Sequence, residues 1–504
     1  MPQDVLSDGF VQLCIDPSLN FYDGKCRVLV EGQFYDPGEG CTVVADQIVP
    51  VTSLRDVDCR FGAGSVLAES LKKIFCECPK NIEVHALPRE DPAAGVAAVY
   101  DLTITGPATS AGLIDLYLFE GDYSVALTID SGDAVADIAA KLIAALPANF
   151  PYTTAATATG VTFTARNDGE VGNYLTMVFN WRNRQGVTPA GVTMSLAQTT
   201  PGSGDLPVLD LPSVLGVCCY SCIAVLSGDN AQHENWERYL KTQWDCDGPQ
   251  CFGHAYTYAP GTPAQVLSRF HNSAEISKIA HCPGDTAPPW FKVAAYAAKS
   301  CCTACDNPEL SIQGRNYGVL TCIRVPGTCT SCYSYDEQLL LRENNFVVTG
   351  PLQAGAGQYT SPYIFNDVTN NLYDNLGRRN ATFWDVSSKR LIAKTAIEIA
   401  AHLQTYNGLG LFTKNTTIKE GVFGTNPRLI HAGVRAWAKD QVGTLFSEFD
   451  DIDNDIQVKT DFEVASNCQG NPNHLHLLFR YRQPSRVDRI ITTLQPDLLD
   501  NCDR

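Results

Sequence analysis

The twenty cysteines of this 504-residue chain are distributed so unevenly that they divide the sequence into parts. Six lie within residues 14–78, twelve within residues 218–332, and two near the end of the chain, at Cys468 and Cys502. Residues 79–217 contain none. Because a chain of this length usually needs more than one hydrophobic core, we expect the cysteine-free segment to be a separate structural part.

The cysteine-free segment has the pattern of a small α+β domain. Residues 99–129 are short runs rich in Thr, Val, Leu and Tyr, broken by glycines, which is typical of β-strands. An alanine-rich stretch between Ser131 and Pro147 predicts a helix that Ser131 caps. More strand-like runs follow. We therefore predict a β-rich domain at residues 95–205, inserted into a larger one.

The segments on either side of this insertion, residues 25–94 and 206–380, indicate one discontinuous α/β core domain. Helical patterns alternate there with short apolar runs, as in a layered α/β structure. The helix candidates are residues 65–75, 233–242 and 290–299, and the strand candidates are residues 82–87 and 222–226. The fold class predicted for the whole chain is a multidomain α+β or α/β protein.

Residues 381–483 carry the strongest helical signals and are predicted to form a C-terminal α/β domain. A first helix, capped by Ser387 or Ser388, should extend to Tyr406. A second should begin at Asn426 and Pro427 and extend through Phe446.

The second of these helices separates apolar from basic residues. At 100° per residue, Ile430, Val434, Trp437 and Leu445 fall within about 80° of one another. Arg428, His431, Arg435 and Lys439 form a separate basic stripe, followed by an acidic run at residues 448–455. A solvated helix face and a contact surface for a partner both explain the stripe, and the acidic run has the same two interpretations.

The two ends of the chain, residues 1–24 and 484–504, contain short strand-like runs with too little apolar surface to fold alone. Such ends either fray or pair with another part of a structure. The first residues have neither the basic nor the apolar region of a secretory signal, and no run of 18 apolar residues is present. We therefore expect neither export by a signal peptide nor a membrane span.

The net charge of −18 argues against nucleic acid or an anionic membrane as a partner, because both require clustered Lys and Arg. The sequence also lacks a Walker loop, a G-x-S-x-G elbow and an H-E-x-x-H helix. His474 and His476 alternate on one predicted strand and are interpreted as strand residues rather than metal ligands. We therefore expect a protein that is not an enzyme and that needs no cofactor.

Five segments, in their order along the chain, resemble the tail sheath proteins of contractile, Mu-like bacteriophages. Each is a short glycine turn or strand end, and their collinearity carries the resemblance. They are residues 25–32 (KCRVLVEG), 60–67 (RFGAGSVL), 167–173 (NDGEVGN), 383–386 (FWDV) and 487–498 (VDRIITTLQPDL).

The resemblance implies a sheath core with the insertion facing outward, a tube-facing C-terminal domain at residues 381–483, and terminal arms at residues 1–24 and 484–504. Sheath subunits of this family stack as six-fold rings around a tail tube and contract to drive it through the host envelope. The implied partners are other copies of the chain, the tail tube protein, and baseplate and tail terminator proteins. The implied location is the virion tail, assembled in the host cytoplasm, with Arg428, Arg435 and Lys439 as candidate tube contacts.

The cysteines leave three interpretations open: disulfides within or between subunits, a structural zinc site, or inert buried thiols. Cys302-x2-Cys305 and Cys329-x2-Cys332 have the spacing of a zinc ribbon, and Cys218, Cys219 and Cys222 offer a third knuckle. A zinc-binding protein or enzyme is therefore the alternative function. If the arms cross between subunits, Cys14 and Cys502, and less strongly Cys26 and Cys468, are candidates for disulfides between subunits. A secreted disulfide-rich adhesin would need an export signal.

Overall fold

The computed structural model describes most of the chain and divides it into two compact units, Met1–Leu409 and Gly410–Arg504. The described residues are 26–35, 43–78, 82–119, 123–180, 187–216, 218–243, 251–304, 307–326, 333–351, 359–373, 377–379, 383–445, 447, 455–460 and 475–479. No helix among them is long and apolar enough to cross a membrane.

A six-stranded sheet in the order β13-β12-β11-β1-β3-β2 forms the centre of the first unit. Its strands are β1 (Arg27–Gln33), β2 (Val49–Val51), β3 (Glu83–Arg89), β11 (Cys222–Val225), β12 (His254–Pro260) and β13 (Ile276–His281). All pair in parallel except β2, which is antiparallel to β3. Val28, Leu29 and Val30 of β1 are fully buried, as expected of a parallel strand covered on both faces.

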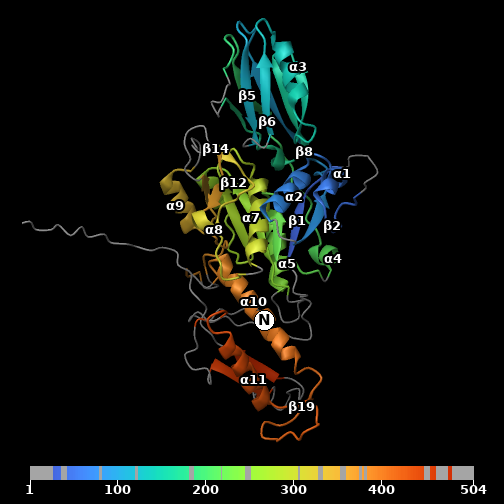
Figure 1. Cartoon of the computed structure of the whole chain (residues 1–504), viewed down its shortest axis with the longest axis vertical. Coiled ribbons are helices and arrows are strands. Elements are labelled where there is room, and N and C mark those ends of the chain that lie inside the picture. Colours follow the sequence, from blue (N-terminus) through green and yellow to red (C-terminus); the bar gives the residue numbers. More distant parts are fainter. Residues whose placement is uncertain are drawn as a thin grey trace, which may run out of the picture. The chain divides into compact units, whose positions relative to one another are not determined.

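Helices cover both faces of this sheet (Figure 1). On one face, α2 (Val66–Glu77) packs against α7 (Pro289–Ala304), and their apolar residues share a core with Val28 and Val30. On the other face, α4 (Leu211–Leu215) and α5 (Asn230–Thr242) share a core with Leu29 and Leu87. The predicted α/β layer structure is present, and Ser65 caps α2 by accepting a hydrogen bond from the Ala68 amide at 3.0 Å.

The insertion contains two antiparallel sheets, β10-β4-β8-β7 and β6-β5-β9, and one long helix. Its elements are β4 (Ala97–Ile104), β5 (Gly112–Leu118), β6 (Tyr123–Ile129), α3 (Val135–Ala145), β7 (Tyr152–Thr157), β8 (Gly160–Asp168), β9 (Met177–Phe179) and β10 (Met194–Thr200). Its apolar residues join the core of the rest of the first unit, which we call the body. The ring centroid of Phe119 lies 6.1 Å from that of Trp290 and 6.4 Å from that of Phe291.

The rest of the first unit consists of short elements around the sheet and one long helix at its end. These are α1 (Val57–Phe61), α6 (Pro263–Ser268), α8 (Gly314–Tyr317), β14 (Val325–Pro326), α9 (Tyr335–Glu343), β15 (Thr349–Pro351), β16 (Tyr359–Thr360), β17 (Pro362–Ile364) and α10 (Val386–Gln404). The amides of Ala280 and Asn370 donate to the carbonyls of Val347 and Ile276, so the outer edge of β13 is covered.

The second unit is small. It contains β18 (Gly410–Leu411), β19 (Gly424–Thr425), α11 (Pro427–Asp440), β20 (Ile456–Thr460) and β21 (Leu475–Phe479). Strands β20 and β21 pair antiparallel, and α11 packs on β20. Ile430, Val434 and Leu445 are buried and Trp437 is half-buried, in agreement with the predicted apolar face.

Three predicted helix ends were wrong. Helix α3 begins at Val135 after Ala134, because Ser131 instead donates to the carbonyl of Thr109. Helix α10 is capped by Asp385, whose carboxylate accepts from the amide of Ser388, rather than by Ser387 or Ser388. Helix α11 ends at Asp440, because Gly443 soon follows in a left-handed conformation with φ of 89°.

The predicted domain boundaries stay predictions. One observation bears on them, since α10 belongs to the first compact unit, whereas the sequence analysis assigned residues 381–483 to a C-terminal domain. The predicted arms, residues 1–24 and 484–504, lie outside the described residues.

Two disulfides connect described residues. Cys76 in α2 is bonded to Cys322, with 5.9 Å between their Cα atoms, and Cys219 is bonded to Cys251, with 5.1 Å. The first joins residues 246 positions apart. Polar contacts support it: Lys73 Nζ donates to the Cys322 carbonyl at 2.9 Å, and the Cys322 amide donates to Glu77 at 2.9 Å.

Replacing both Cys76 and Cys322 by Ser should lower the free energy of unfolding by about 2–5 kcal/mol, because the open chain recovers loop entropy in the unfolded state. Urea unfolding without reductant measures this loss. Cys218→Ser, at an exposed thiol outside these disulfides, is the matched control and should have little effect. With reductant the wild type should approach the double variant, and equal stability of the two proteins without reductant would contradict the prediction.

Candidate functional site

The central sheet has the strand order of a doubly wound fold, and that order indicates where such a fold would bind a ligand. The chain passes from β1 to β3 on one side and later continues with β11 on the other side of β1. Ligands of doubly wound sheets bind outside the carboxyl ends of the strands at such a switch point. A small-molecule site of this fold would therefore be expected at the carboxyl ends of β1 and β11.

The space beside this switch point is occupied by side chains of the protein itself. Glu31, 2% exposed, accepts hydrogen bonds from the guanidinium of Arg89 and the indole of Trp236. Arg89 also donates to the carbonyl of Pro207 and pairs with Asp46 at 2.8 Å. The buried charges of Glu31 and Arg89 thus have internal partners, as buried charges require.

The insertion is joined to the body at the same end of the sheet. Gln33, the last residue of β1, donates to the Asp91 carboxylate at 2.6 Å and to the Asp168 carbonyl at 2.7 Å. Asn167 donates to Asp91 at 3.0 Å and accepts from the amide of Val66 at 3.0 Å. Burial raises the pKa of Asp91, although the hydrogen bonds from Asn167 and Gln33 oppose the shift.

The segment 167–173, singled out by the sequence analysis, is therefore the joint between insertion and body. Two of its glycines have a structural reason. Gly169 has φ of 100°, a backbone conformation that side chains disfavour. A Cβ on Gly172 would lie 2.7 Å from the Cβ of Ala165, closer than atoms pack.

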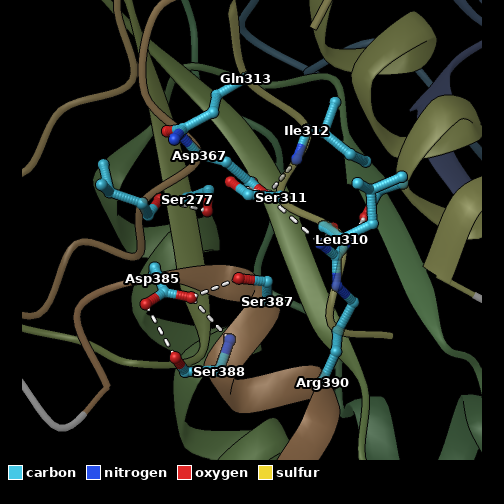
Figure 2. A network of polar contacts seen from close by, with 12 residues as sticks. Ser277, Leu310, Ser311, Ile312, Gln313, Asp367, Asp385, Ser387, Ser388 and Arg390 are labelled. Atoms are coloured by element: carbon cyan, nitrogen blue, oxygen red, sulfur yellow. Dashed lines mark hydrogen bonds and ion pairs between the residues drawn. The ribbon is translucent and has the colours of Figure 1, made fainter. Parts of the chain in front are cut away.

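A second polar network fixes the first turns of α10 to the body (Figure 2). Asp385 caps the helix, accepting from the Ser388 amide at 2.6 Å and from the hydroxyls of Ser387 and Ser388 at 2.6 and 2.8 Å. Arg390 donates to Ser300 at 2.7 Å and to the Leu310 carbonyl at 2.8 Å.

The buried partner of Arg390 is Asp367, which is fully buried and 3.2 Å from its guanidinium. Asp367 also accepts from the hydroxyl of Tyr296 and from the Ile312 amide at 2.8 Å. Burial alone would lower the pKa of Arg390, but the Asp367 carboxylate, together with Tyr256, Cys222 and Tyr296, outweighs this effect and raises the pKa. Removing one partner of such a pair usually costs about 3–5 kcal/mol, so the network holds α10 firmly.

The neighbouring Lys389 is also buried on the body. Its ammonium donates to the Ala274 carbonyl at 2.9 Å and lies 3.5 Å from Glu275. Burial lowers its pKa, and the nearby Glu275 carboxylate opposes the shift. Two consecutive basic residues of α10 are thus held inside the first unit. The chain continues from this anchored helix to Gly410, where the second unit begins.

The candidate tube contacts lie on α11. Arg428 and Lys439 are exposed and Arg435 is half-buried. His431 is hydrogen-bonded to the Ile456 carbonyl at 2.9 Å, so it connects α11 to β20. Of the acidic run, Asp455 is described and residues 448–454 lie outside the described residues.

The structure separates the predicted cysteine sites. Cys14, Cys468 and Cys502 lie outside the described residues, as do Cys305, Cys329, Cys332 and His474. Cys26 is disulfide-bonded, and Cys302 is half-buried on α7. The third zinc knuckle is not formed, because Cys219 is bonded to Cys251 and Cys222 is buried in β11. Within the described part of the chain, no group of three or more His, Cys, Asp or Glu residues is arranged to hold a metal ion.

Sequence reasoning singled out residues 167–173 by their resemblance to sheath proteins, without predicting that they form a joint, and it missed both buried ion pairs. The signals were present, since Glu31 and Arg89 each interrupt an apolar strand and Arg390 interrupts an apolar helix face. Their partners are 58 and 23 residues away along the chain, too far for a local pattern to pair them.

Comparison with known proteins finds relatives among tail sheath proteins, and no protein-family model matches the chain. The Mu-like prophage FluMu tail sheath protein of Haemophilus influenzae is 30% identical over 160 residues, which are 32% of this chain and 32% of that protein. The chain thus matches about a third of the length of this curated relative.

Three solved structures are also similar. The anti-feeding prophage baseplate, solved with 6-fold symmetry, has a TM-score of 0.49 at 9% identity, with 98% of this chain and 99% of that one covered. The anti-feeding prophage helical sheath in the contracted state has 0.46 at 10% identity, covering 98% and 100%. The sheath tail protein of Desulfitobacterium hafniense has 0.44 at 12% identity, covering 90% and 93%. The predicted resemblance to Mu-like tail sheath proteins is confirmed by the sequence match to the Haemophilus influenzae protein.

Proposed function

We propose that this chain is a structural subunit of a contractile tail sheath. The observation that carries the proposal is the sequence similarity to a Mu-like prophage tail sheath protein, together with the collinear segments that resemble this family. The occupied space at the switch point also supports the proposal. Arg89 and Trp236 donate hydrogen bonds to Glu31 where a doubly wound enzyme would bind its substrate. The subunit would act without a catalytic residue or a cofactor.

In the proposed assembly, subunits form six-fold rings around a tail tube, and the rings stack into a helical polymer. The terminal arms, residues 1–24 and 484–504, add strands to sheets of neighbouring subunits, which gives a flexible but continuous mesh. The insertion at residues 95–205 faces outward, and residues 381–483 face the tube. Contraction is a one-way change from a metastable lattice to a more extensively packed one, and it drives the tube through the host envelope.

The mechanical demand on such a subunit agrees with the two joints described above. Force that enters at the tube-facing part would reach the rest of the first unit through α10, whose Lys389 is buried there and whose Arg390 pairs there with the buried Asp367. Separating Arg390 from the buried Asp367 would leave that carboxylate without its cation, so this attachment resists bending better than an exposed linker. The proposed partners are further copies of the chain, the tube protein, and the baseplate and terminator proteins at the ends of the tail.

Self-assembly is the first test. The purified chain should form rings or long tubes visible by negative-stain electron microscopy. Deleting residues 1–20 or 484–504 should give a folded monomer without tubes, because the lost strands add little to the subunit's own core. Circular dichroism and gel filtration serve as folding controls. Tubes of normal length from either truncated chain would refute the proposed role of the arms.

Disulfides between subunits are the second test. If Cys14 and Cys502 bridge neighbours after lysis exposes particles to oxidants, non-reducing electrophoresis of intact particles should show a ladder that collapses to one band near 54.8 kDa with reductant. Ser replacements at both positions should shorten the ladder and leave tubes intact. Cys218→Ser is the control, as an exposed thiol of the body. A single monomer band from alkylated, unreduced particles would exclude the cross-links.

The third test concerns the basic stripe of α11. The double variant Arg428→Glu and Lys439→Glu should reduce binding to tail tubes about tenfold or more in co-sedimentation, since two favourable charge contacts become repulsive. Lys414→Glu and Lys419→Glu make the same change at exposed positions of the same unit and should bind normally. Sheath polymers without tube should form in both cases. Unchanged tube binding by the first variant would place the tube contact elsewhere.

A further inference from the structure

The four-stranded sheet of the insertion has two open edges, formed by β7 and β10. Its strand order is β10-β4-β8-β7, so each of these two strands is paired on one side only. Among the described residues, no backbone hydrogen bond other than those of the sheet reaches residues 152–157 or 194–200. Each edge therefore presents a row of N–H and C=O groups to solvent, to which another strand can be added.

Neither edge carries the charged residues or the prolines by which proteins usually prevent such pairing. Strand β7 has the sequence YTTAAT and β10 has the sequence MSLAQTT. Bulges also prevent edge pairing, but β7 pairs regularly along its whole length, and β10 is regular from Met194 to Gln198, before a bulge at its end. Each strand has four exposed side chains: Thr153, Ala155, Ala156 and Thr157 in β7, and Ser195, Ala197, Gln198 and Thr199 in β10.

The directions of the strands suit a repeat of this sheet. Strand β10 is antiparallel to β4, β4 to β8, and β8 to β7, so β7 and β10 run in opposite directions. A second copy of the sheet placed beside the first therefore brings β7 of one copy against β10 of the other as an antiparallel pair, the more stable kind. The other sheet of the insertion lacks this property. Its edge strands β6 and β9 are both antiparallel to β5 and thus parallel to each other, and β9 has three residues.

The two edges also match in the faces that they present. Across the sheet, Ala155 of β7 is opposite Thr162, which is opposite Asp101 of β4. Asp101 is in turn opposite Ala197 of β10. Because residues opposite each other in a sheet point to the same face, Ala155 and Ala197 share the solvent face, and both are exposed. The neighbouring Phe163 points to the other face and is fully buried. A sheet extended from β10 to β7 of another copy would keep one solvent face and one core face across the junction.

We propose that the insertions of neighbouring copies join edge to edge, with β7 of one copy pairing antiparallel with β10 of the next. The pairing rests on the proposed function in one respect, since copies in a ring or a helical polymer meet through two different surfaces, as β7 and β10 are. A two-fold contact of β7 with β7 would leave both β10 edges open. Joining β7 to β10 uses both edges of each copy inside the polymer, and main-chain hydrogen bonds supply the affinity.

Charges placed on both edges of the full-length chain test the pairing. A like-charge variant carries Thr153→Lys, Ala155→Lys, Ser195→Lys and Ala197→Lys. The concentration at which half of its chains sediment as polymer should rise about tenfold, because like charges on adjacent strands repel each other. An opposite-charge variant combines Thr153→Glu and Ala155→Glu with the same two lysines on β10 and should assemble near the wild-type concentration.

The two variants change the same four exposed positions, so each is the matched control of the other. Circular dichroism of the dispersed chains checks that both are folded. Assembly of the like-charge variant at the wild-type concentration would overturn the pairing. An equal loss of assembly in both variants would also overturn it, because a two-fold contact of β7 with β7 predicts that result.

Hydrogen exchange of the wild-type chain tests the pairing without any substitution. The amides of β7 and β10 that point away from the sheet should exchange at least about tenfold more slowly in the polymer than in the dispersed chain. Tubes in which these amides stay unprotected would overturn the pairing and leave the sheath function intact. Protection of these amides in oligomers that are not tubes would support the pairing and contradict the sheath function.

Discussion

The first unit depends on the position of β1 at the centre of a parallel sheet. Because β1 pairs with β3 on one edge and β11 on the other, both connections must cross a face of the sheet, and helices cover both faces as a result. The constraint is visible in the sequence as the run of Val28, Leu29 and Val30, three consecutive apolar residues that are all fully buried. The insertion interrupts the connection from β3 to β11, so it emerges at the carboxyl ends of the strands and its joint lies there.

Buried charge is used at two places for position rather than for chemistry. Glu31 and Arg89 form an ion pair beside the switch point, and Asp367 and Arg390 form another at the start of α10. Such pairs gain little net stability because desolvation offsets their attraction. Their value is geometric, since a shift of α10 that separates Arg390 from Asp367 leaves both charges buried and unpaired. The helix therefore has one strongly preferred position relative to the body.

The sequence predicted the local pattern well and the long-range pairing poorly. Ser65 before an apolar period located α2, and Asn426 with Pro427 located the start of α11, because capping and periodicity are local properties. The N-caps predicted at Ser131 and Ser387 were wrong, because the residue that caps a helix depends on which hydrogen bonds compete for its side chain. Ser131 found the Thr109 carbonyl, and Asp385 lay two residues ahead of Ser387. Residues 167–173 were singled out by resemblance, but neither their role as a joint nor the partners of Asn167 could be predicted, since Val66 and Asp91 precede it by 101 and 76 residues.

The disulfide between Cys76 and Cys322 also sets an order of events in the life of the chain. Its two cysteines are separated by 246 residues, and the whole insertion lies between them. Because α2 is synthesised long before Cys322, this bond cannot form until the sheet strands, the insertion and α7 have all been synthesised. The two thiols meet only when the loop that carries Cys322 settles against Lys73 and Glu77. The bond therefore ties together two segments that the polar contacts of Lys73 and Glu77 also hold in place, and it joins the beginning of the first unit to a part of the chain that is made much later.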